Sequence, residues 1–363
     1  MGDHSELPVY SLFVHPNDLR GMLRDPEQEE AFQGRLKVGR QAYRIMIALR
    51  GAYIRRYPKK SFSVQFLSPN SFQAARELHL NAEYADPSMI RNKLSFDFFQ
   101  RIGALAPHAH FVKLLLNGGS AGLYLQLESV DDLYLKKRNL PPGAIFYAIN
   151  DDANFSLLRS NSNRLKDELE EGYEGKVSTE ADWESLRELL YVINTTPQAD
   201  FPNAIDQLVD IEQYFNWLAG VVCTHNFDGF IQNYALYRNG DTGRFQPIPW
   251  DYDGTWGRNL RGERLRADYI PITGYNSLTA RLLAVPKFRV RYKRRMEEVL
   301  ETEFTADRLT PLIENLLQTV RPALLDDPHR KEFISRFDGE FEVILKFINE
   351  RSRYLFDHLV DLN

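Results

Sequence analysis

One stretch of the chain constrains the fold more than any other, and it runs from Asp210 to Gly257. Asp210 and Gln213 have the spacing of a capping box, and apolar residues on a wide face follow them, so we expect a buried helix that ends near His225. A polar loop comes next. It leads into two strands joined by the turn NGDTG, the first over residues 234–238 and the second ending just before the sequence DYDG.

Three oxygen-bearing side chains lie near the ends of this predicted hairpin. Asp228 lies in the loop, Asn233 stands at the start of the first strand, and Asp251 follows the second strand. Because an antiparallel hairpin returns the chain to where it began, we expect all three side chains to meet at one edge of the sheet. Asp253, further along, is either an additional metal ligand or a turn residue.

This order of helix, loop aspartate, asparagine, hairpin and aspartate is typical of the metal-binding half of protein kinases. Phosphoryl transfer needs a carboxylate that orients the attacking hydroxyl, and hard oxygen ligands that hold magnesium. We therefore assign the base-like role to Asp228 and the metal to Asn233 and Asp251. Other signatures of eukaryotic kinases are missing: Asn226 and Phe227 stand where H-R would precede the aspartate, and no G-x-G-x-x-G occurs. An ordinary eukaryotic-type kinase is excluded.

The N-terminal part is predicted to be a small lobe of strands with one helix. Residues 43–50 and 61–67 have strand-like sequences on either side of a basic turn, and a second hairpin is expected over residues 111–127. Between the two hairpins we expect a helix that is capped by Asp86 and ends at Gly103.

A break in the sequence suggests where this lobe ends. The segment LPPGAIFYAIND combines a Pro-Pro-Gly break with a short apolar strand, which suits a hinge. We therefore divide the chain into an N-terminal lobe, residues 1–146, and a helix-rich C-terminal lobe, residues 147–363. The predicted fold class is α+β.

A cation near the first hairpin is expected to anchor a phosphate, and Arg50, Lys59 and Lys60 are the candidates. Lys60 shares strand parity with the apolar residues of the following strand. If those residues face the interior, Lys60 points toward a cleft and Lys59 points away. We favour Lys60, with Arg50 as a second binding residue. A kinase lysine is usually paired with a helix glutamate, and here Glu83 and Glu128 stay open as its partner.

Composition excludes several classes of protein. The 363 residues are 43% hydrophobic with a formal net charge of −5, which gives no general attraction to nucleic acid or to anionic membranes. Cys223 is the single cysteine, so an intrachain disulfide or a cysteine-based zinc cluster is excluded and a reducing, intracellular compartment is expected. The histidines show no H-E-x-x-H spacing. No stretch is long and apolar enough for a membrane span.

Four segments carry a family resemblance, and they read RYPKKSF, LNAEYADPSMIRNKLSFDFF, FNWLAGVVCTHNFDGFIQNYALYRN and PWDYDGTWG. They resemble the CotH family of spore-coat kinases, whose pattern extends here from about Arg50 to Leu283. The resemblance implies an atypical, two-lobed protein-kinase-like fold that uses ATP with Mg²⁺, or with Mn²⁺, to phosphorylate serines of spore-coat proteins. Asp228 falls on the family's catalytic aspartate and Asp251 on its metal-binding aspartate.

The same resemblance places Tyr147 and Trp250 on the aromatic residues that sandwich adenine. It also implies Ser-rich, basic spore-coat proteins as substrates, a role in coat assembly, and a location in the cytoplasm of the sporulating mother cell in association with the spore coat. We expect no nucleic-acid and no membrane partner. The acidic segment DELEEGYEG, residues 167–175, is either a docking face for basic substrates or a solvated helix.

Two competing functions would use the same residues. A morphogenetic scaffold of the spore coat would keep a kinase-like fold and bind nucleotide without transferring phosphate. A glycoside hydrolase would also use two carboxylates in a cleft, but it explains neither Asn233 nor an opposing lysine.

Overall fold

The computed structural model describes residues 6–24, 30–51, 53–67 and 72–363. The chain forms two compact units, and each is assembled from separate segments. The first, which we call the barrel unit, comprises Met1–Lys93, His108–Ser129 and Leu312–Glu342. The second, which we call the hairpin unit, comprises Leu94–Pro107, Val130–Pro311 and Val343–Asn363. No single cut along the chain separates the two units.

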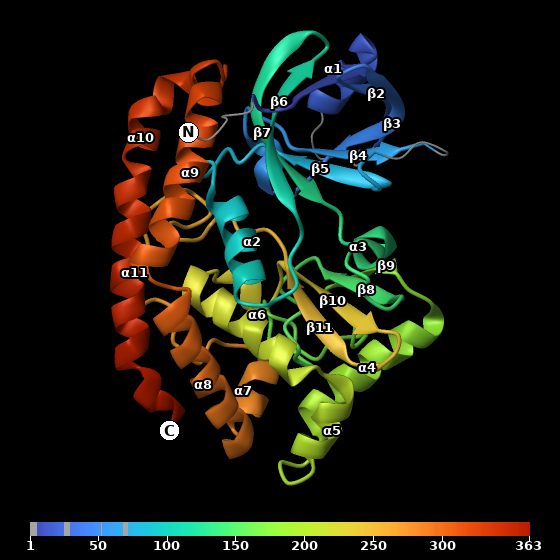
Figure 1. Cartoon of the computed structure of the whole chain (residues 1–363). Helices are drawn as coiled ribbons and strands as arrows, with labels where there is room; N and C mark the ends of the chain where they lie inside the picture. Colours follow the sequence, from blue (N-terminus) through green and yellow to red (C-terminus); the bar gives the residue numbers. More distant parts are fainter. Residues whose placement is uncertain (1–5, 25–29, 52, 68–71) are drawn as a thin grey trace. The chain divides into compact units, whose positions relative to one another are not determined.

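The strands of the barrel unit, drawn in blue to teal in Figure 1, close into a barrel in the order β1-β2-β3-β4-β5-β7-β6. All neighbours are antiparallel except β1 and β6, whose parallel pairing closes the barrel. The strands are β1 Val9–Val14, β2 Phe32–Val38, β3 Gln41–Leu49, β4 Phe62–Phe66, β5 Glu77–Asn81, β6 Ala109–Leu116 and β7 Gly119–Glu128.

Alternating burial explains why these segments are strands. In β4 the side chains of Phe62, Val64 and Phe66 are buried and those between them are not, as period-2 patterning requires. The predicted strands 43–50 and 61–67 are confirmed as β3 and β4, which pair with Ile47 opposite Val64. The second hairpin is also confirmed, as β6 and β7.

The helix that Asp86 is expected to cap begins four residues later than predicted, because α2 spans Arg91–Arg101. Met89 has a positive φ of 62°, which no helix accommodates. Asp86 instead holds a turn: its carboxylate accepts hydrogen bonds from the backbone N–H groups of Ser88 at 2.8 Å and Arg91 at 2.9 Å. The predicted stop is correct, since Gly103 has a φ of 71° just after the helix.

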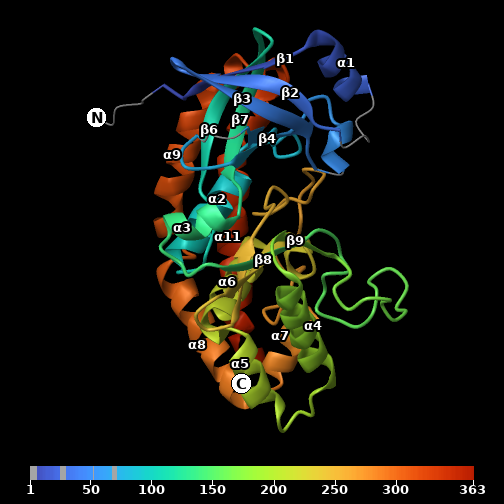
Figure 2. The same ribbon diagram turned by 90° about the vertical axis from the view of Figure 1, so that its right-hand side faces the viewer.

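The hairpin unit is built on an antiparallel sheet in the order β11-β10-β8-β9. Helix α6 packs against β11, and α4 lies beside α7 (Figure 2). The strands are β8 Gly143–Ala148, β9 Tyr173–Val177, β10 Tyr234–Asn239 and β11 Phe245–Pro249. The helices in this part of the hairpin unit are α3 Asp132–Lys137, α4 Glu180–Thr195, α5 Phe201–Leu208 and α6 Ile211–Thr224. The barrel unit contains the short helix α1 Pro16–Arg24.

From the sequence we expect helices directly after Trp256, but the C-terminal part is helical only from Ser277 onward. The connection between Trp256 and Ser277 carries turns and bends instead. The helices are α7 Ser277–Leu283, α8 Pro286–Thr302, α9 Ala306–Leu325, α10 Ile334–Asp338 and α11 Glu340–Asp357. A strand-rich N-terminal part and a helix-rich C-terminal part confirm the mixed, α+β class. Among the described residues, we find no helix with the length and hydropathy of a membrane span.

Candidate functional site

Helix α6 delivers the chain to the site, and its two ends are fixed as the sequence predicts. Asp210 caps the first turn by accepting a hydrogen bond from the N–H of Gln213 at 3.1 Å. His225 ends the helix in a left-handed conformation with a φ of 66°. The buried guanidinium of Arg351 donates to the otherwise free carbonyl of Val222, at 2.8 Å and 3.1 Å. These hydrogen bonds therefore fix the end of α6, from which the loop begins.

Asn226 ties this loop to the end of β11, a role that sequence reasoning missed. Its side-chain oxygen accepts a hydrogen bond from the N–H of Gly229 at 3.1 Å, and its side-chain nitrogen donates to the carbonyl of Asp251 at 3.2 Å. A Cβ at Gly229 would lie 3.1 Å from the Asn226 side chain and 3.1 Å from the Tyr252 hydroxyl. No sequence motif identifies Asn226, because its hydrogen-bond partner lies 25 residues further along the chain.

Asp228 and Asp251 lie near enough for their charges to interact. Asp228 starts a short 3₁₀ turn, Asp228–Phe230, and its carboxyl has a raised pKa. Partial burial is the main cause, followed by the negative charges of Asp251 and then Asp151. Asp151 is the second residue that sequence reasoning missed, although it stands in the expected hinge segment. Three carboxylates thus share one electrostatic neighbourhood in the hairpin unit.

Asn233 stands at the same edge of the sheet as Asp251. Its carbonyl accepts a hydrogen bond from the N–H of Trp250 at 2.9 Å, one step beyond the paired residues Tyr234 and Pro249. Asn233 and Asp251 both have a φ of 58°, in the left-handed region that Asn and Asp tolerate better than other side chains. Each such residue costs of order 1 kcal/mol, and such strain is concentrated at functional sites. Asp253 lies in the bend that follows.

The aromatic pair predicted to hold adenine is in the hairpin unit. Tyr147 of β8 and Trp250 meet edge to face, with ring centroids 5.1 Å apart and an interplanar angle of 82°. The Tyr147 hydroxyl accepts from the N–H of Val130 at 2.9 Å and donates to the carbonyl of the same residue at 3.2 Å, which fixes the tyrosine ring. A sandwiched base would therefore require Trp250 to move.

The cationic candidates belong to the barrel unit. Arg50 donates to the side chain of Asn81, and Lys60, which is partly exposed, donates to the carbonyl of Arg55. Lys59 is fully buried and forms an ion pair with Asp327 at 2.8 Å. The strand parity used to choose between the two lysines does not reach them, because β4 begins only at Phe62.

The two glutamates left open as lysine partners have other contacts in the barrel unit. Glu83 accepts a hydrogen bond from the side chain of Asn92 at 3.1 Å. Glu128 accepts one from the N–H of His108 at 3.0 Å. The buried Lys59 is paired with Asp327, and the charge of Glu83 also acts on it.

The acidic segment 167–175 is neither a helix nor a free acidic face. Glu170 pairs with Arg187 at 2.6 Å, and Glu171 pairs with Arg159 at 2.7 Å and accepts backbone hydrogen bonds. Tyr173 then begins strand β9. Two of the acids proposed for substrate docking are therefore already neutralised within this chain.

The donor set at the hairpin edge fits a hard divalent cation. Asp228 and Asp251 carry carboxylate oxygens and Asn233 carries an amide oxygen, which are the ligand types that such a cation prefers. Across the described part of the chain, no group of three or more His, Cys, Asp or Glu side chains could hold a metal ion. Magnesium commonly binds to one or two carboxylates and takes its other ligands from phosphates and water. Burial, and after it the negative charges of Asp251 and Asp151, raise the pKa of Asp228, and a bound cation would offset that repulsion.

The place of His225 at the end of the helix suggests a capping side chain, but the residue is a buried neutral acceptor. Its Nε2 accepts a hydrogen bond from the N–H of Ile270 at 3.1 Å, and burial lowers its pKa to about 3, with the Arg351 charge adding to the effect. In the unfolded chain this pKa returns to about 6.5. The unfolded state therefore binds the extra proton between these values, and stability falls as the pH drops through this window.

We expect the free energy of unfolding to fall by about 2 kcal/mol between pH 7 and pH 5 through His225 alone. Urea unfolding at both pH values measures this change. The variant His225→Gln, which retains an acceptor but does not titrate, should lose less stability over the same interval. An equal pH dependence in both proteins would show that His225 is not the titrating group.

Comparison with known proteins agrees with the residue pattern. The chain matches the family described as CotH kinase protein over residues 47–355. It is 50% identical over 359 residues to the inner spore coat protein H of Bacillus subtilis strain 168, with 99% of each chain covered. The inner spore coat protein H-like protein of the same strain is 28% identical over 310 residues, which covers 85% of this chain and 88% of that protein.

A solved structure gives a weaker match. The Shewanella oneidensis MR-1 toxin-antitoxin complex of HipA, HipB and operator DNA contains a chain that is 14% identical, with 81% of this chain and 60% of that chain covered. The TM-score is 0.33, and at this score the likeness does not establish a shared fold. The sequence matches are sufficient by themselves. With a family match across most of its length and a relative of equal length at 50% identity, this chain belongs to the CotH kinase protein family.

Proposed function

We propose that this protein transfers the γ-phosphoryl group of ATP to serine hydroxyls of Ser-rich, basic spore-coat proteins, in the mother cell during coat assembly. The observation that supports the proposal most is the interaction of the Asp228 and Asp251 charges, with the backbone of Asn233 bonded to the residue that precedes Asp251. Family membership and the spore-coat relative support the substrate class.

Asp228 would orient the serine hydroxyl and accept its proton as the serine oxygen bonds to the γ-phosphorus and the bond to the β-phosphate oxygen breaks. Its partial burial and raised pKa suit a group that takes up a proton. Asp251 and Asn233 would hold Mg²⁺ or Mn²⁺. The metal, when bound, neutralises charge on the phosphates.

The remaining nucleotide contacts follow from the same proposal. Tyr147 and Trp250 would hold the adenine ring, with the tyrosine fixed by its hydroxyl and the tryptophan moving to admit the base. Lys60, with Arg50, would bind phosphate from the barrel unit. Lys59 is not available for this role because it is buried against Asp327.

A spore-coat scaffold without phosphate transfer is the competing function. The missing kinase signatures motivate it. The crowding of Asp228 against Asp251 and Asp151 argues against it, because a scaffold gains nothing from carboxylates that repel one another.

Transfer of labelled phosphate distinguishes these functions. Purified protein is incubated with ATP labelled at the γ-phosphate and a peptide of alternating serine and lysine residues, with Mg²⁺, with Mn²⁺ or with EDTA. We expect label on serine with either metal, none with EDTA, and almost none with Asp251→Asn, since this change removes a charged oxygen ligand. Equal labelling by the wild-type protein and Asp251→Asn would favour the scaffold.

A further inference from the structure

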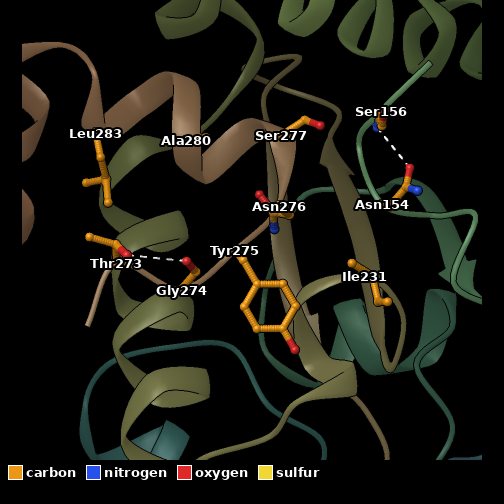
Figure 3. Close-up of a pocket in the computed structure, with 10 residues that line it drawn as sticks. All are labelled: Asn154, Ser156, Ile231, Thr273, Gly274, Tyr275, Asn276, Ser277, Ala280 and Leu283. Carbon is orange, nitrogen blue, oxygen red and sulfur yellow. Dashed lines mark hydrogen bonds between the residues drawn. The ribbon is translucent and has the colours of Figure 1, made fainter. Parts of the chain in front are cut away.

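A groove with a volume of about 650 Å³ lies in the hairpin unit beside the loop that carries Asp228 (Figure 3). One wall is the segment from Thr273 through the first turns of α7, and the opposite wall contains Asn154 and Ser156. Ile231 lies between them. The volume is within the range of about 300–1,000 Å³ that is usual for ligand sites.

The groove adjoins Asp228 through direct contacts on both sides of that residue. The N–H of Ile231 donates to the carbonyl of Asp228 at 3.1 Å. The hydroxyl of Tyr275 donates to the carbonyl of Phe227 at 2.7 Å, and its ring lies against Phe230 with centroids 4.6 Å apart. The charge of Asp228 also contributes to the raised pKa of Tyr275. A molecule in this groove would therefore lie beside the loop that carries the proposed base.

The wall that contains Tyr275 is held in place by hydrogen bonds and close packing. Asn276 donates to the carbonyl of Phe230 at 2.9 Å and accepts from the N–H of Thr279 at 2.7 Å, so it joins the catalytic loop to the start of α7. Gly274 has a φ of 59°, and a Cβ there would lie 2.4 Å from the Phe230 ring. These contacts hold the wall of the groove in a fixed position relative to the loop that carries Asp228.

The chemistry of the lining selects the kind of ligand. Amide and hydroxyl groups alternate with small apolar surfaces, and no side chain that lines the groove carries a charge. A nucleotide or a phosphate would require cations or a cluster of N–H donors. An extended peptide instead presents a backbone N–H and C=O at every residue, which amides and hydroxyls pair well.

We propose that this groove binds the segment of the protein substrate adjacent to the acceptor serine. This inference rests on the proposed function, because it is Asp228 that makes a hydroxyl-bearing peptide the fitting occupant. Tyr275 forms the wall nearest to the base, and Ala280 of α7 lies exposed on the rim. Binding here places a serine next to Asp228 without any contact to ATP.

The variant Ala280→Arg tests this by filling the groove with a long side chain, while arginine remains a good helix former. We expect it to raise the KM for the serine-lysine peptide about tenfold and to leave the KM for ATP unchanged. The matched control is Ala181→Arg, an equally exposed alanine at the start of α4, which should leave both constants unchanged.

Fluorescence anisotropy of the labelled peptide, without ATP, separates this inference from the proposed activity. Peptide bound by the wild-type protein and by Ala181→Arg, but about tenfold more weakly by Ala280→Arg, supports the groove even if no phosphate is transferred. Equal binding by all three proteins, or no binding by the wild-type protein, overturns it. Absence of transfer with intact groove binding counts against the proposed function alone.

Discussion

Replacing Asp228 with Asn is expected to lower kcat for phosphate transfer by roughly 10²–10⁴-fold, the usual contribution of a positioned general base. The amide keeps the size of the side chain and can still accept a hydrogen bond, but it cannot take up the proton of the serine. The KM for ATP should change little, because the proposed adenine and phosphate contacts belong to other residues.

The same substitution should not destabilise the protein. Asp228 is partly buried near the negative charges of Asp251 and Asp151, which raise its pKa together with burial. Removing its charge therefore relieves repulsion, and the melting temperature should stay constant or rise. A large loss of activity with no loss of stability is the mark of a residue retained for function.

Asp151→Asn is the matched control, since it removes a neighbouring charge without touching the base. Because Asp151 helps to raise the pKa of Asp228, its removal should move the acid limb of the pH–rate profile to lower pH and leave the maximal rate within about twofold. A rate for Asp228→Asn close to that of the wild-type protein would remove Asp228 from the reaction.

The core of the site could be predicted because it depends on local sequence. The capping residue Asp210, the end of α6 near His225 and the hairpin turn each leave a signature within a few residues. A hairpin brings its two ends together by geometry, so the meeting of Asn233 with Asp251 needs no further information. The hydrophobic alternation of β3 and β4 is equally local.

What the sequence did not predict depends on contacts between distant segments. Asp151 joins the carboxylate group only because β8 pairs with β10, with Ala148 opposite Tyr234. Asn226 acts through the carbonyl of Asp251. Asp86 looks like a helix cap but holds a turn in which Met89 adopts a positive φ, because tertiary packing overrides the local preference.

Lys59 is the clearest case, since its partner Asp327 lies 268 residues away in the chain. The lysine donates to the Asp327 carboxylate at 2.8 Å and to the carbonyl of Leu123, and it lies 4.6 Å from the centre of the Tyr124 ring. The carboxylate also accepts from the N–H groups of Leu123 at 2.9 Å and His329 at 2.8 Å. The pair therefore attaches the segment Leu312–Glu342 to the barrel of the same unit.

We expect Asp327→Asn or Lys59→Met alone to lower the free energy of unfolding by about 3–5 kcal/mol, because each leaves one buried charge without its partner. The double variant should cost much less than the sum of the two. Asn keeps one acceptor oxygen, which can accept from the N–H of Leu123 or of His329, and Met fills the space of the lysine stem. Urea unfolding at neutral pH, followed by fluorescence, measures all three variants.

The pKa of Lys59 explains why the double variant should be tolerated. Burial lowers this pKa to about 8 although Asp327 acts to raise it, so the cost of removing the ammonium from water exceeds its attraction to the carboxylate. The ion pair therefore stabilises the fold no more than an uncharged pair of similar shape would. A single buried charge without its partner destabilises the fold strongly.

Asp338→Asn provides the surface comparison in the same unit. Arg321 and Asp338 are 2.8 Å apart and both are more than 40% exposed, so breaking this pair should cost less than about 1 kcal/mol. Simple additivity of Lys59→Met and Asp327→Asn would contradict the coupling. It would mean that another group stabilises the buried charge of Lys59. Lys59 would then be a candidate for binding phosphate beside Lys60.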